Sequence, residues 1–307
     1  GLISFSAGET SARMLKWLLD NKSDEYHFHI LFANTGRENN ETLRFAKECE
    51  EHFNCEVVWL EANFRPSYPG EKLSVDQANC HKVVNYYTAT RNEDWRHRNN
   101  TPYEEMVKTY GLANISSKFS TRELKLRPMT SYMRSLGYNK GDYETFIGLR
   151  IDEIDRIAKD RIELKIRYPF IEWLEQSKQH INFWWKLQPF RLKLKGWEGN
   201  CVTCYKKYVV KLAKIFKDDP WKFEFDKYLE KVYGYFVTDS RKAELKKKGK
   251  VAKLPIKLYR ENNSVEDIAK KSLEVTNVHD DSKDFNYQHQ MFEGESCEVF
   301  SGCGDLT

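Results

Sequence analysis

The sequence lacks the features that would place it in a membrane or outside the cell. Among its 307 residues there is no apolar run of about 18 residues, so no transmembrane helix is expected. No secretory signal is recognisable at the start. Seven cysteines in a chain of this size are expected to be reduced thiols or ligands, not a disulfide framework. We therefore expect a cytoplasmic protein without membrane partners. Gly1 in place of Met leads us to expect that a few native residues precede it.

A large surplus of one charge is also lacking. The chain has 50 Lys and Arg against 46 Asp and Glu, a net charge of +4, which does not by itself argue for nucleic acid. A basic run between Arg241 and Lys253 could contact a nucleic-acid backbone. A solvated helix face or loop is the commoner explanation of such a run, so a nucleic-acid partner stays an open alternative.

What is present is a strand, a short turn and a helix at the very start. Apolar residues 2–5 precede the sequence Ser6-Ala7-Gly8-Glu9-Thr10-Ser11. The helix that follows carries apolar residues at helical spacing: Met14, Leu15, Leu18 and Leu19. A turn of small residues exposes backbone N–H groups beside the positive helix end, which suits phosphate. It is not the Walker loop, because no Gly-Lys-Ser/Thr follows. The alternative is an ordinary strand–helix connection.

Strands and helices alternate through the first half of the chain. Strands are expected over residues 28–33, near 57–60 and over 145–149, and helices over 41–53, 102–110 and 128–136, with residues 62–100 irregular. This order predicts a parallel sheet covered by helices. Ligands of such sheets bind beyond the carboxyl ends of the strands. The first turn, Asn34-Thr35-Gly36 and Gly148-Leu149-Arg150 all fall at such ends.

Four segments, in order, resemble the phosphoadenosine phosphosulfate (PAPS) reductase-like branch of the PP-loop adenine-nucleotide alpha hydrolases. They are Ile3-Ser4-Phe5-Ser6-Ala7-Gly8-Glu9-Thr10-Ser11, Phe32-Ala33-Asn34-Thr35-Gly36, residues 119–129 and residues 148–156. Residues 183–190 and Gly199-Asn200-Cys201-Val202-Thr203-Cys204 resemble proteins of this branch often found in phages. The resemblance covers roughly residues 1–210. It implies an α/β fold, with a parallel-sheet PP-loop domain over residues 1–195. A mainly helical region with a partly flexible tail is expected over residues 196–307.

The resemblance also implies roles for individual residues. The pyrophosphate or terminal phosphates would be held by Ser4, Ser6, Gly8, Thr10 and Ser11. Adenine or ribose would lie near Asn34, Thr35 and Gly36. Candidate phosphate contacts are Lys125, Arg127, Arg150 and Arg156; of these, Lys125, Arg150 and Arg156 are the candidates for catalysis. Asp152 and Glu153 would either hold Mg²⁺ or orient the arginines. For each charge the alternative is a solvated helix face.

The chemistry that the resemblance implies is attack at the α-phosphorus of an adenine nucleotide. With ATP, a substrate oxygen takes adenylate and pyrophosphate leaves, which often prepares a sulfur transfer or another modification. A PAPS or adenylylsulfate reductase is the alternative enzyme, but the terminal Glu-Cys-Gly-Leu-His of such relatives is missing. A third alternative is a nucleotide-binding regulatory or phage–host interaction protein without turnover. Expected partners are an adenine nucleotide, a second copy of the chain, and a sulfur carrier or nucleic acid.

A Cys-x-x-Cys pair, Cys201 and Cys204, is the second chemical feature. Its spacing suits zinc, a [4Fe-4S] cluster or a redox pair. Further ligands could come from Cys80, Cys297 and Cys303. Many relatives carry a cysteine where Ser120 stands, and serine is a poor substitute for a thiolate ligand. The alternative is two structural thiols at a helix start. Helices are expected over residues 205–216, 221–233 and 264–273, the last with Ser264 as its N-cap.

Overall fold

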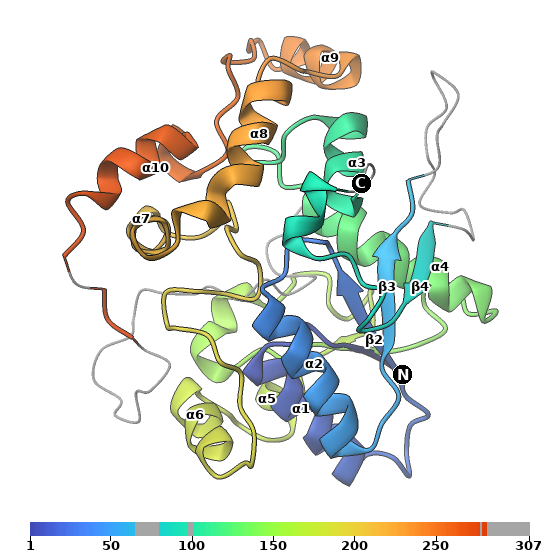
Figure 1. Cartoon of the computed structure of the whole chain (residues 1–307). Helices are drawn as coiled ribbons and strands as arrows, with labels where there is room; N and C mark the ends of the chain where they lie inside the picture. Colours follow the sequence, from blue (N-terminus) through green and yellow to red (C-terminus); the bar gives the residue numbers. More distant parts are fainter. Residues whose placement is uncertain (65–79, 98–100, 277, 281–307) are drawn as a thin grey trace.

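The computed structural model describes residues 1–64, 80–97, 101–276 and 278–280 (Figure 1). Within them one sheet of six strands has the order β4-β3-β2-β1-β5-β6. The strands are β1 (Leu2–Ser4), β2 (His29–Asn34), β3 (Val58–Ala62), β4 (His81–Val84), β5 (Thr145–Phe146) and β6 (Ile166–Arg167). All neighbours are parallel except β3 and β4. The predicted α/β fold with a parallel sheet is therefore confirmed, with one antiparallel strand at its edge.

Two of these strands were not predicted. Strand β4 lies inside residues 62–100, so the expectation that this whole stretch is irregular is wrong. It pairs with β3, placing Val84 opposite Trp59 and His81 opposite Ala62. Strand β6 has only two residues, Ile166 and Arg167. Segments this short carry too few side chains to show a strand alternation in the sequence.

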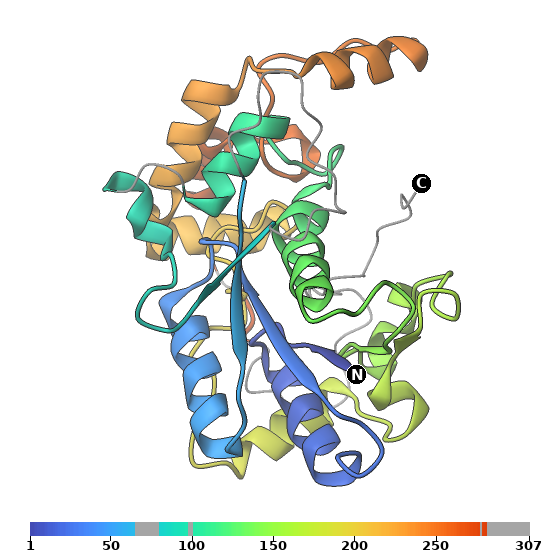
Figure 2. The same ribbon diagram turned by 90° about the vertical axis from the view of Figure 1, so that its right-hand side faces the viewer.

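Successive side chains of each strand point to opposite faces of the sheet, and a layer of helices covers each face. On one face, Ile3, Ile30 and Phe32 pack with Leu15 of α1 (Glu9–Asn21) and Leu43 of α2 (Asn40–Phe53). On the other face, strand residues and helix residues form a second apolar cluster: Leu2, Leu31 and Leu60 with Met129 and Met133 of α4 (Arg127–Ser135). Figure 2 shows the sheet from its side, with these helices beside it. Because successive strand residues point to opposite faces, one short strand serves both layers.

The connections between these layers are short helices and helical turns. They are η1 (Asn92–Arg96), α3 (Pro102–Tyr110), the π-helical turn η2 (Arg122–Leu126), η3 (Ile151–Arg156), α5 (Pro169–Glu172) and α6 (Lys178–Lys186). The turn η2 runs directly into α4, and it contacts strands β2 and β3 as well as helix α3. It therefore carries residues 122–126 close to the carboxyl ends of two strands.

The rest of the described chain is helical. Its elements are α7 (Val209–Asp218), η4 (Pro220–Phe223), α8 (Glu224–Tyr233), α9 (Asp239–Lys247), η5 (Arg260–Asn262) and α10 (Val265–Ser272). Helix α7 begins at Val209, so the predicted start at residue 205 is wrong. Residues 205–208 instead form a turn in which the Lys207 N–H donates to the Cys204 carbonyl at 3.0 Å. Ser264 caps α10 as predicted, its hydroxyl accepting from the Asp267 N–H.

These C-terminal helices lie beyond the carboxyl ends of the parallel strands (Figure 1). Leu212, Phe223 and Leu229 share one apolar cluster with Met106 of α3 and Leu124 of η2. The division into domains at residue 195 stays a prediction, and the tail predicted to be partly flexible falls largely on residues 281–307, outside the described residues. The basic helix α9 buries no residue. None of the helices in the described part of the chain combines the length and the apolar character that crossing a bilayer requires.

Candidate functional site

The N-terminal turn (residues 6–11) is organised around the hydroxyl of Ser11. This oxygen accepts from the N–H groups of Ser6 and Gly8, each at 3.3 Å, and from the Ser6 hydroxyl at 2.9 Å, and it donates to the Gly8 carbonyl at 3.0 Å. Ala7 has a φ of 56°, the left-handed region that glycine adopts most readily. The turn therefore holds an alanine in a backbone conformation that glycine favours.

The first residue of α1 is held by a later part of the chain. The Arg191 guanidinium donates to both Glu9 carboxylate oxygens, at 2.5 and 3.2 Å, and the Trp185 indole N–H donates to the Glu9 carbonyl at 2.9 Å. Burial raises the pKa of Glu9, and Arg191 opposes that rise. The first N–H groups of a helix have no intrahelical acceptor and lie at its positive end. Arg191 therefore neutralises a carboxylate beside a turn suited to anions.

The end of strand β5 forms the second wall of the site. A Cβ on Gly148 would lie 3.0 Å from Ser11 Cα, so only glycine lets this strand approach the turn so closely. Two residues further on, Arg150 donates to the Thr10 hydroxyl at 3.2 Å. In the sheet order, β1 lies between β2 and β5, and the order reverses there. Such a switch point is where open α/β sheets bind their ligands.

Arg150 is oriented by two carboxylates. It donates to Asp152 at 2.9 Å and pairs with Glu153 at 3.4 Å, and Glu153 also binds Arg156. Asp152 further accepts from the Lys178 N–H at 3.1 Å. Of the two roles weighed for these carboxylates, this geometry matches the orienting one. The alternative role of Asp152 and Glu153 as Mg²⁺ ligands stays a prediction. Among the described residues no group of three or more His, Cys, Asp or Glu could hold a metal ion.

The segment Asn34-Thr35-Gly36 is shaped by buried contacts that the sequence did not reveal. Asn34 is fully buried; its amide donates to Glu61 at 2.7 Å and to the Thr90 carbonyl at 2.8 Å, and its carbonyl oxygen accepts from the Gly36 N–H at 3.1 Å. Glu61 also accepts from the Thr90 N–H at 2.6 Å. Burial raises the pKa of Glu61, whereas the hydrogen bonds from Thr90 and Asn34 lower it. The backbone N–H of Thr35 donates to the Glu38 carboxylate at 2.8 Å.

Arg37, the next residue, links this segment to the C-terminal helices. Its guanidinium donates to Asp226 of α8 at 2.7 Å and also binds the Thr203 hydroxyl. Asp226 accepts in turn from the Tyr259 hydroxyl at 2.7 Å. Both Arg37 and Asp226 are almost fully buried. A buried charge is tolerated only when it is paired and hydrogen-bonded, so this network fixes the position of residues 34–37 relative to α8.

Residues 199–203, here called the crossing segment, contact both the N-terminal turn and residues 37–39. The Asn39 N–H donates to the Asn200 carbonyl and the Val202 N–H donates to the Arg37 carbonyl, each at 2.8 Å. Glu38 and Cys201 form an antiparallel bridge between these two bonds. The Asn200 amide donates to the Ser6 carbonyl at 2.9 Å. The crossing segment therefore joins the N-terminal turn to residues 37–39, a role that its sequence had not indicated.

Lys125 lies in the turn η2, and Arg127 is the first residue of α4, directly after it. Arg127 is only 1% exposed; it donates to Glu123 at 3.3 Å and to the Cys80 sulfur at 3.1 Å. Glu123 is shared with Arg122, whose Nε lies 2.7 Å away. Lys125 is buried in the same turn. The contacts of Arg127 thus run to protein groups beside the start of β4.

The Cys-x-x-Cys pair lies at the end of the crossing segment. The Cys201 sulfur lies 3.8 Å from a Glu38 oxygen. The Ser120 hydroxyl lies 2.8 Å from the hydroxyl of Tyr205, the residue after Cys204. Ser120 therefore contacts the side chain of the residue that follows Cys204. Cys297 and Cys303 lie outside the described residues, and the described ones do not complete a metal site.

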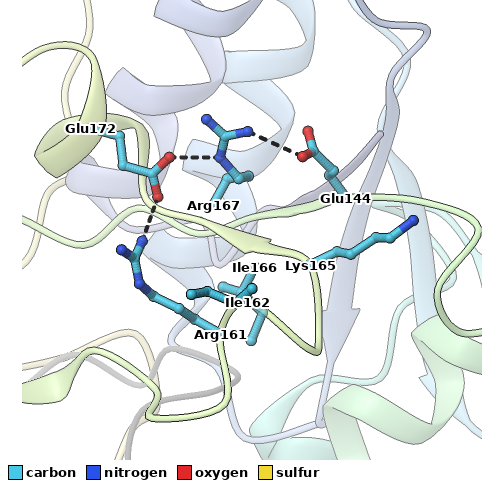
Figure 3. A pocket seen from close by; sticks show the side chains of 7 residues that line it. All are labelled: Glu144, Arg161, Ile162, Lys165, Ile166, Arg167 and Glu172. Atoms are coloured by element: carbon cyan, nitrogen blue, oxygen red, sulfur yellow. Dashed lines mark hydrogen bonds and ion pairs between the residues drawn. The ribbon is translucent and has the colours of Figure 1, made fainter.

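A separate hollow of about 250 Å³ lies at the amino ends of β5 and β6 (Figure 3). The Arg167 guanidinium donates to Glu144 at 3.1 Å and to Glu172 at 2.6 Å. Arg161 also donates to Glu172, at 2.9 Å. Glu144 precedes β5, whereas Gly148 follows it. The hollow is therefore at the other end of the strand from the N-terminal turn and is not part of the candidate site.

Comparison with known proteins identifies a family and a phage relative. A family model described as the phosphoadenosine phosphosulfate reductase domain matches residues 2–198. A relative from Escherichia phage lambda, the "Uncharacterized nin region protein ORF290", is 30% identical over 308 residues, covering 98% of this chain and 95% of the relative. The family match includes the N-terminal turn, η2 and η3, and the phage relative extends over the C-terminal helices as well.

Proposed function

Because the chain belongs to the phosphoadenosine phosphosulfate reductase domain family, we propose that it binds an adenine nucleotide at the carboxyl ends of β1 and β5 and cleaves it between the α and β phosphates. The observation that carries the proposal is the junction at Gly148. There a glycine lets the β5 end touch Ser11, while Arg150 reaches Thr10. Two motifs 140 residues apart thus converge on one turn suited to phosphate.

In this proposal the N-terminal turn and the start of α1 hold the phosphate chain through N–H groups and the Thr10 hydroxyl. Arg150 stabilises the charge that develops on the departing pyrophosphate. Asp152 and Glu153 keep the Arg150 guanidinium in place before the nucleotide binds, which avoids reorganisation during the reaction. Arg156 shares Glu153, and Lys125 is a further candidate cation. Residues 34–36 are assigned to adenine or ribose.

The proposed products are AMP and pyrophosphate. A substrate oxygen attacks the α-phosphorus, the bond to the β-phosphate oxygen breaks, and pyrophosphate leaves with that electron pair. When the acceptor is water, AMP appears directly. When it is a carbon-bound oxygen, sulfur later attacks that carbon, the carbon–oxygen bond breaks, and the oxygen leaves as part of AMP, as in a sulfur-transfer or modification pathway. The protein supplies binding and charge stabilisation, and no covalent protein nucleophile is needed.

The test is to incubate the protein with ATP and Mg²⁺ and to quantify AMP and pyrophosphate. We expect Arg150→Gln to lower turnover by about a hundredfold or more, as for loss of one donor to transition-state charge. Arg167→Gln, in the hollow at the other strand end, is the matched control and should keep wild-type turnover. Tight ATP binding without any AMP would instead favour a regulatory or interaction protein that binds nucleotide without turnover.

A PAPS or adenylylsulfate reductase is the second candidate, and the description of the matching family favours it. It requires a thiol that attacks the sulfate sulfur. Cys297 and Cys303 are the candidates near the end of the chain, though not within Glu-Cys-Gly-Leu-His. Release of sulfite from PAPS with a thiol donor, lost in a Cys297→Ser or Cys303→Ser variant, would support it. Absence of sulfite together with AMP release from ATP would exclude it.

Other functional statements also stay predictions. A [4Fe-4S] cluster or zinc on Cys201, Cys204, Cys297 and Cys303 would be detected as iron or zinc by elemental analysis of protein purified without oxygen. A homodimer, a sulfur carrier or nucleic acid as partner, and a cytoplasmic location rest on the sequence alone. No step of the proposed reaction passes through a cluster.

A further inference from the structure

We propose that helix α9 (Asp239–Lys247) and residues 248–253, here together called the basic arm, bind the phosphate backbone of duplex DNA. Nucleic acid is so far a prediction from the sequence, and the fold adds its exposure, its unpaired charge and its lack of an apolar face. In Figure 1 and Figure 2, α9 lies at the end of the C-terminal region that is farthest from the sheet. The basic arm is therefore a surface separate from the candidate nucleotide site, and the inference does not depend on nucleotide cleavage.

The basic arm is open to solvent along its whole length. Helix α9 buries no residue, and none of residues 239–253 is buried. A helix of nine residues is marginal in water unless it packs against other elements. Packing supplies little stability here, so a partner that covers the basic arm would stabilise it.

The basic arm also carries an excess of charge that the rest of the chain lacks. Seven basic side chains stand against two acidic ones, a net charge of +5, whereas the whole chain has +4. Lys242 pairs with Asp239 at 3.0 Å, and Lys248 pairs with Glu244 at 2.5 Å. Among the residues that the structure describes, no carboxylate forms an ion pair with the other lysines of the basic arm: Lys246, Lys247, Lys250 and Lys253.

Three of these lysines gather at one end of α9. Lys246 and Lys247 are the last two residues of the helix. The Lys250 N–H donates to the Leu245 carbonyl at 2.9 Å, with Gly249 at a φ of 64°, and this bond keeps Lys250 at the same end. The negative end of a helix favours a lysine by only about 0.3–1 kcal/mol, and like charges within one turn repel each other. A polyanion would remove that repulsion.

The composition of the basic arm favours duplex DNA over other polyanions. A helix that binds a membrane surface needs an apolar face, and α9 has only Ala243 and Leu245. Single-stranded nucleic acid is bound on aromatic side chains that stack with the bases, and residues 239–253 contain no Phe, Tyr or Trp. Helical RNA has a major groove too narrow for side chains, whereas that of DNA, about 12 Å wide, admits a helix. We therefore expect phosphate contacts to duplex DNA without readout of the bases.

The experiment measures binding of the full chain to a fluorescent duplex of about 20 base pairs, by anisotropy, at about 50 to 200 mM salt. In the test variant glutamine replaces Lys246, Lys247 and Lys250. In the matched control it replaces three other exposed lysines: Lys118, Lys140 and Lys270.

We expect the wild type to bind two unrelated duplex sequences equally well. In the test variant alone, binding at about 50 mM salt should weaken at least tenfold. The slope of log affinity against log salt should become shallower by about three, one for each lost phosphate contact. Arginine at the same three positions should keep the wild-type slope. AMP release from ATP should be the same in all variants, which separates this inference from the proposed function.

Several results would overturn the inference: no duplex binding by the wild type, unchanged binding in the test variant, or an equal loss in the control. Stronger binding of single-stranded DNA, helical RNA or vesicles of anionic lipid would also overturn it, because the basic arm would then belong to that partner. Both variants should melt as the wild type does, since α9 buries no residue. Should the test variant not fold, Lys250→Gln alone, beyond the end of the helix, should reduce the slope by about one, and an unchanged slope would overturn the inference.

Discussion

Replacing Ser11 by alanine tests the N-terminal turn most directly. Ser11 is 1% exposed, and its hydroxyl takes part in four hydrogen bonds within residues 6–11. Two of them lie near 3 Å and two at 3.3 Å, so we assign about 2 kcal/mol in total, at the lower end of ordinary net values. Without this acceptor the Ser6 and Gly8 N–H groups are released and the turn loses its preformed shape. If that free energy is lost from binding, the Kd for ATP rises roughly tenfold to thirtyfold.

The assay is isothermal titration of Ser11→Ala with ATP, accompanied by a thermal unfolding curve. Ser272→Ala is the matched control, because Ser272 is also buried and donates to the Ala269 carbonyl at 2.6 Å in helix α10, outside the candidate site. Both variants should melt within a few degrees of the wild type, and only Ser11→Ala should bind ATP more weakly. Wild-type affinity in Ser11→Ala, or equal weakening in Ser272→Ala, would refute the role of the turn.

Three further substitutions address close packing and buried charge. Gly148→Ala forces a Cβ to 3.0 Å from Ser11 Cα, so we expect about 1–3 kcal/mol of overpacking and weaker ATP binding by titration; wild-type affinity would contradict the junction. Asp226→Ala leaves the buried Arg37 charge without its carboxylate and should lower the free energy of unfolding in urea by about 3–5 kcal/mol. A loss below about 1 kcal/mol would contradict that estimate. Burial raises the pKa of Glu230 from 4.5 to about 7, so the folded state holds this proton more tightly than the unfolded state does. The resulting contribution to stability is fully present below pH 4.5 and is lost as the pH rises through 7. Between these values the free energy of unfolding falls by up to about 1.4 kcal/mol per pH unit. Glu230→Gln should remove this part of the pH dependence in unfolding curves at pH 5 and 8, and an unchanged dependence would rule it out.

The sequence predicts the parts of the site that are built locally. The turn after β1 follows an apolar strand and opens an amphipathic helix, so its position is read from neighbouring residues. Gly148 and Arg150 follow another apolar run, and the strand order brings the two ends together. The contact of Arg150 with Thr10 agrees with this convergence. The assignment of each residue to phosphate, adenine or ribose stays a prediction.

The remaining parts depend on contacts that leave no periodic signal. The Asn34 amide meets a carboxylate 27 residues away, and the Asn200 amide meets a carbonyl 194 residues away. Neither partner could be chosen from the residues around it. The sequence also cannot tell a phosphate contact from an ion pair. Arg127 was marked as a phosphate contact from its motif, and its guanidinium binds Glu123 and Cys80.

The parts of the candidate site are far apart in the sequence, and this affects when they form during synthesis. The N-terminal turn emerges first, Arg150 lies 140 residues after its partner, and Asn200 lies 194 residues after Ser6. At about 5–20 residues per second, the ribosome needs roughly 10 to 40 s to add that last wall. Until then a nascent chain has the turn without the groups that enclose it. If the site binds a nucleotide as proposed, the complete set of contacts forms only after residue 200 has been added, and before that the sheet depends on its own apolar packing.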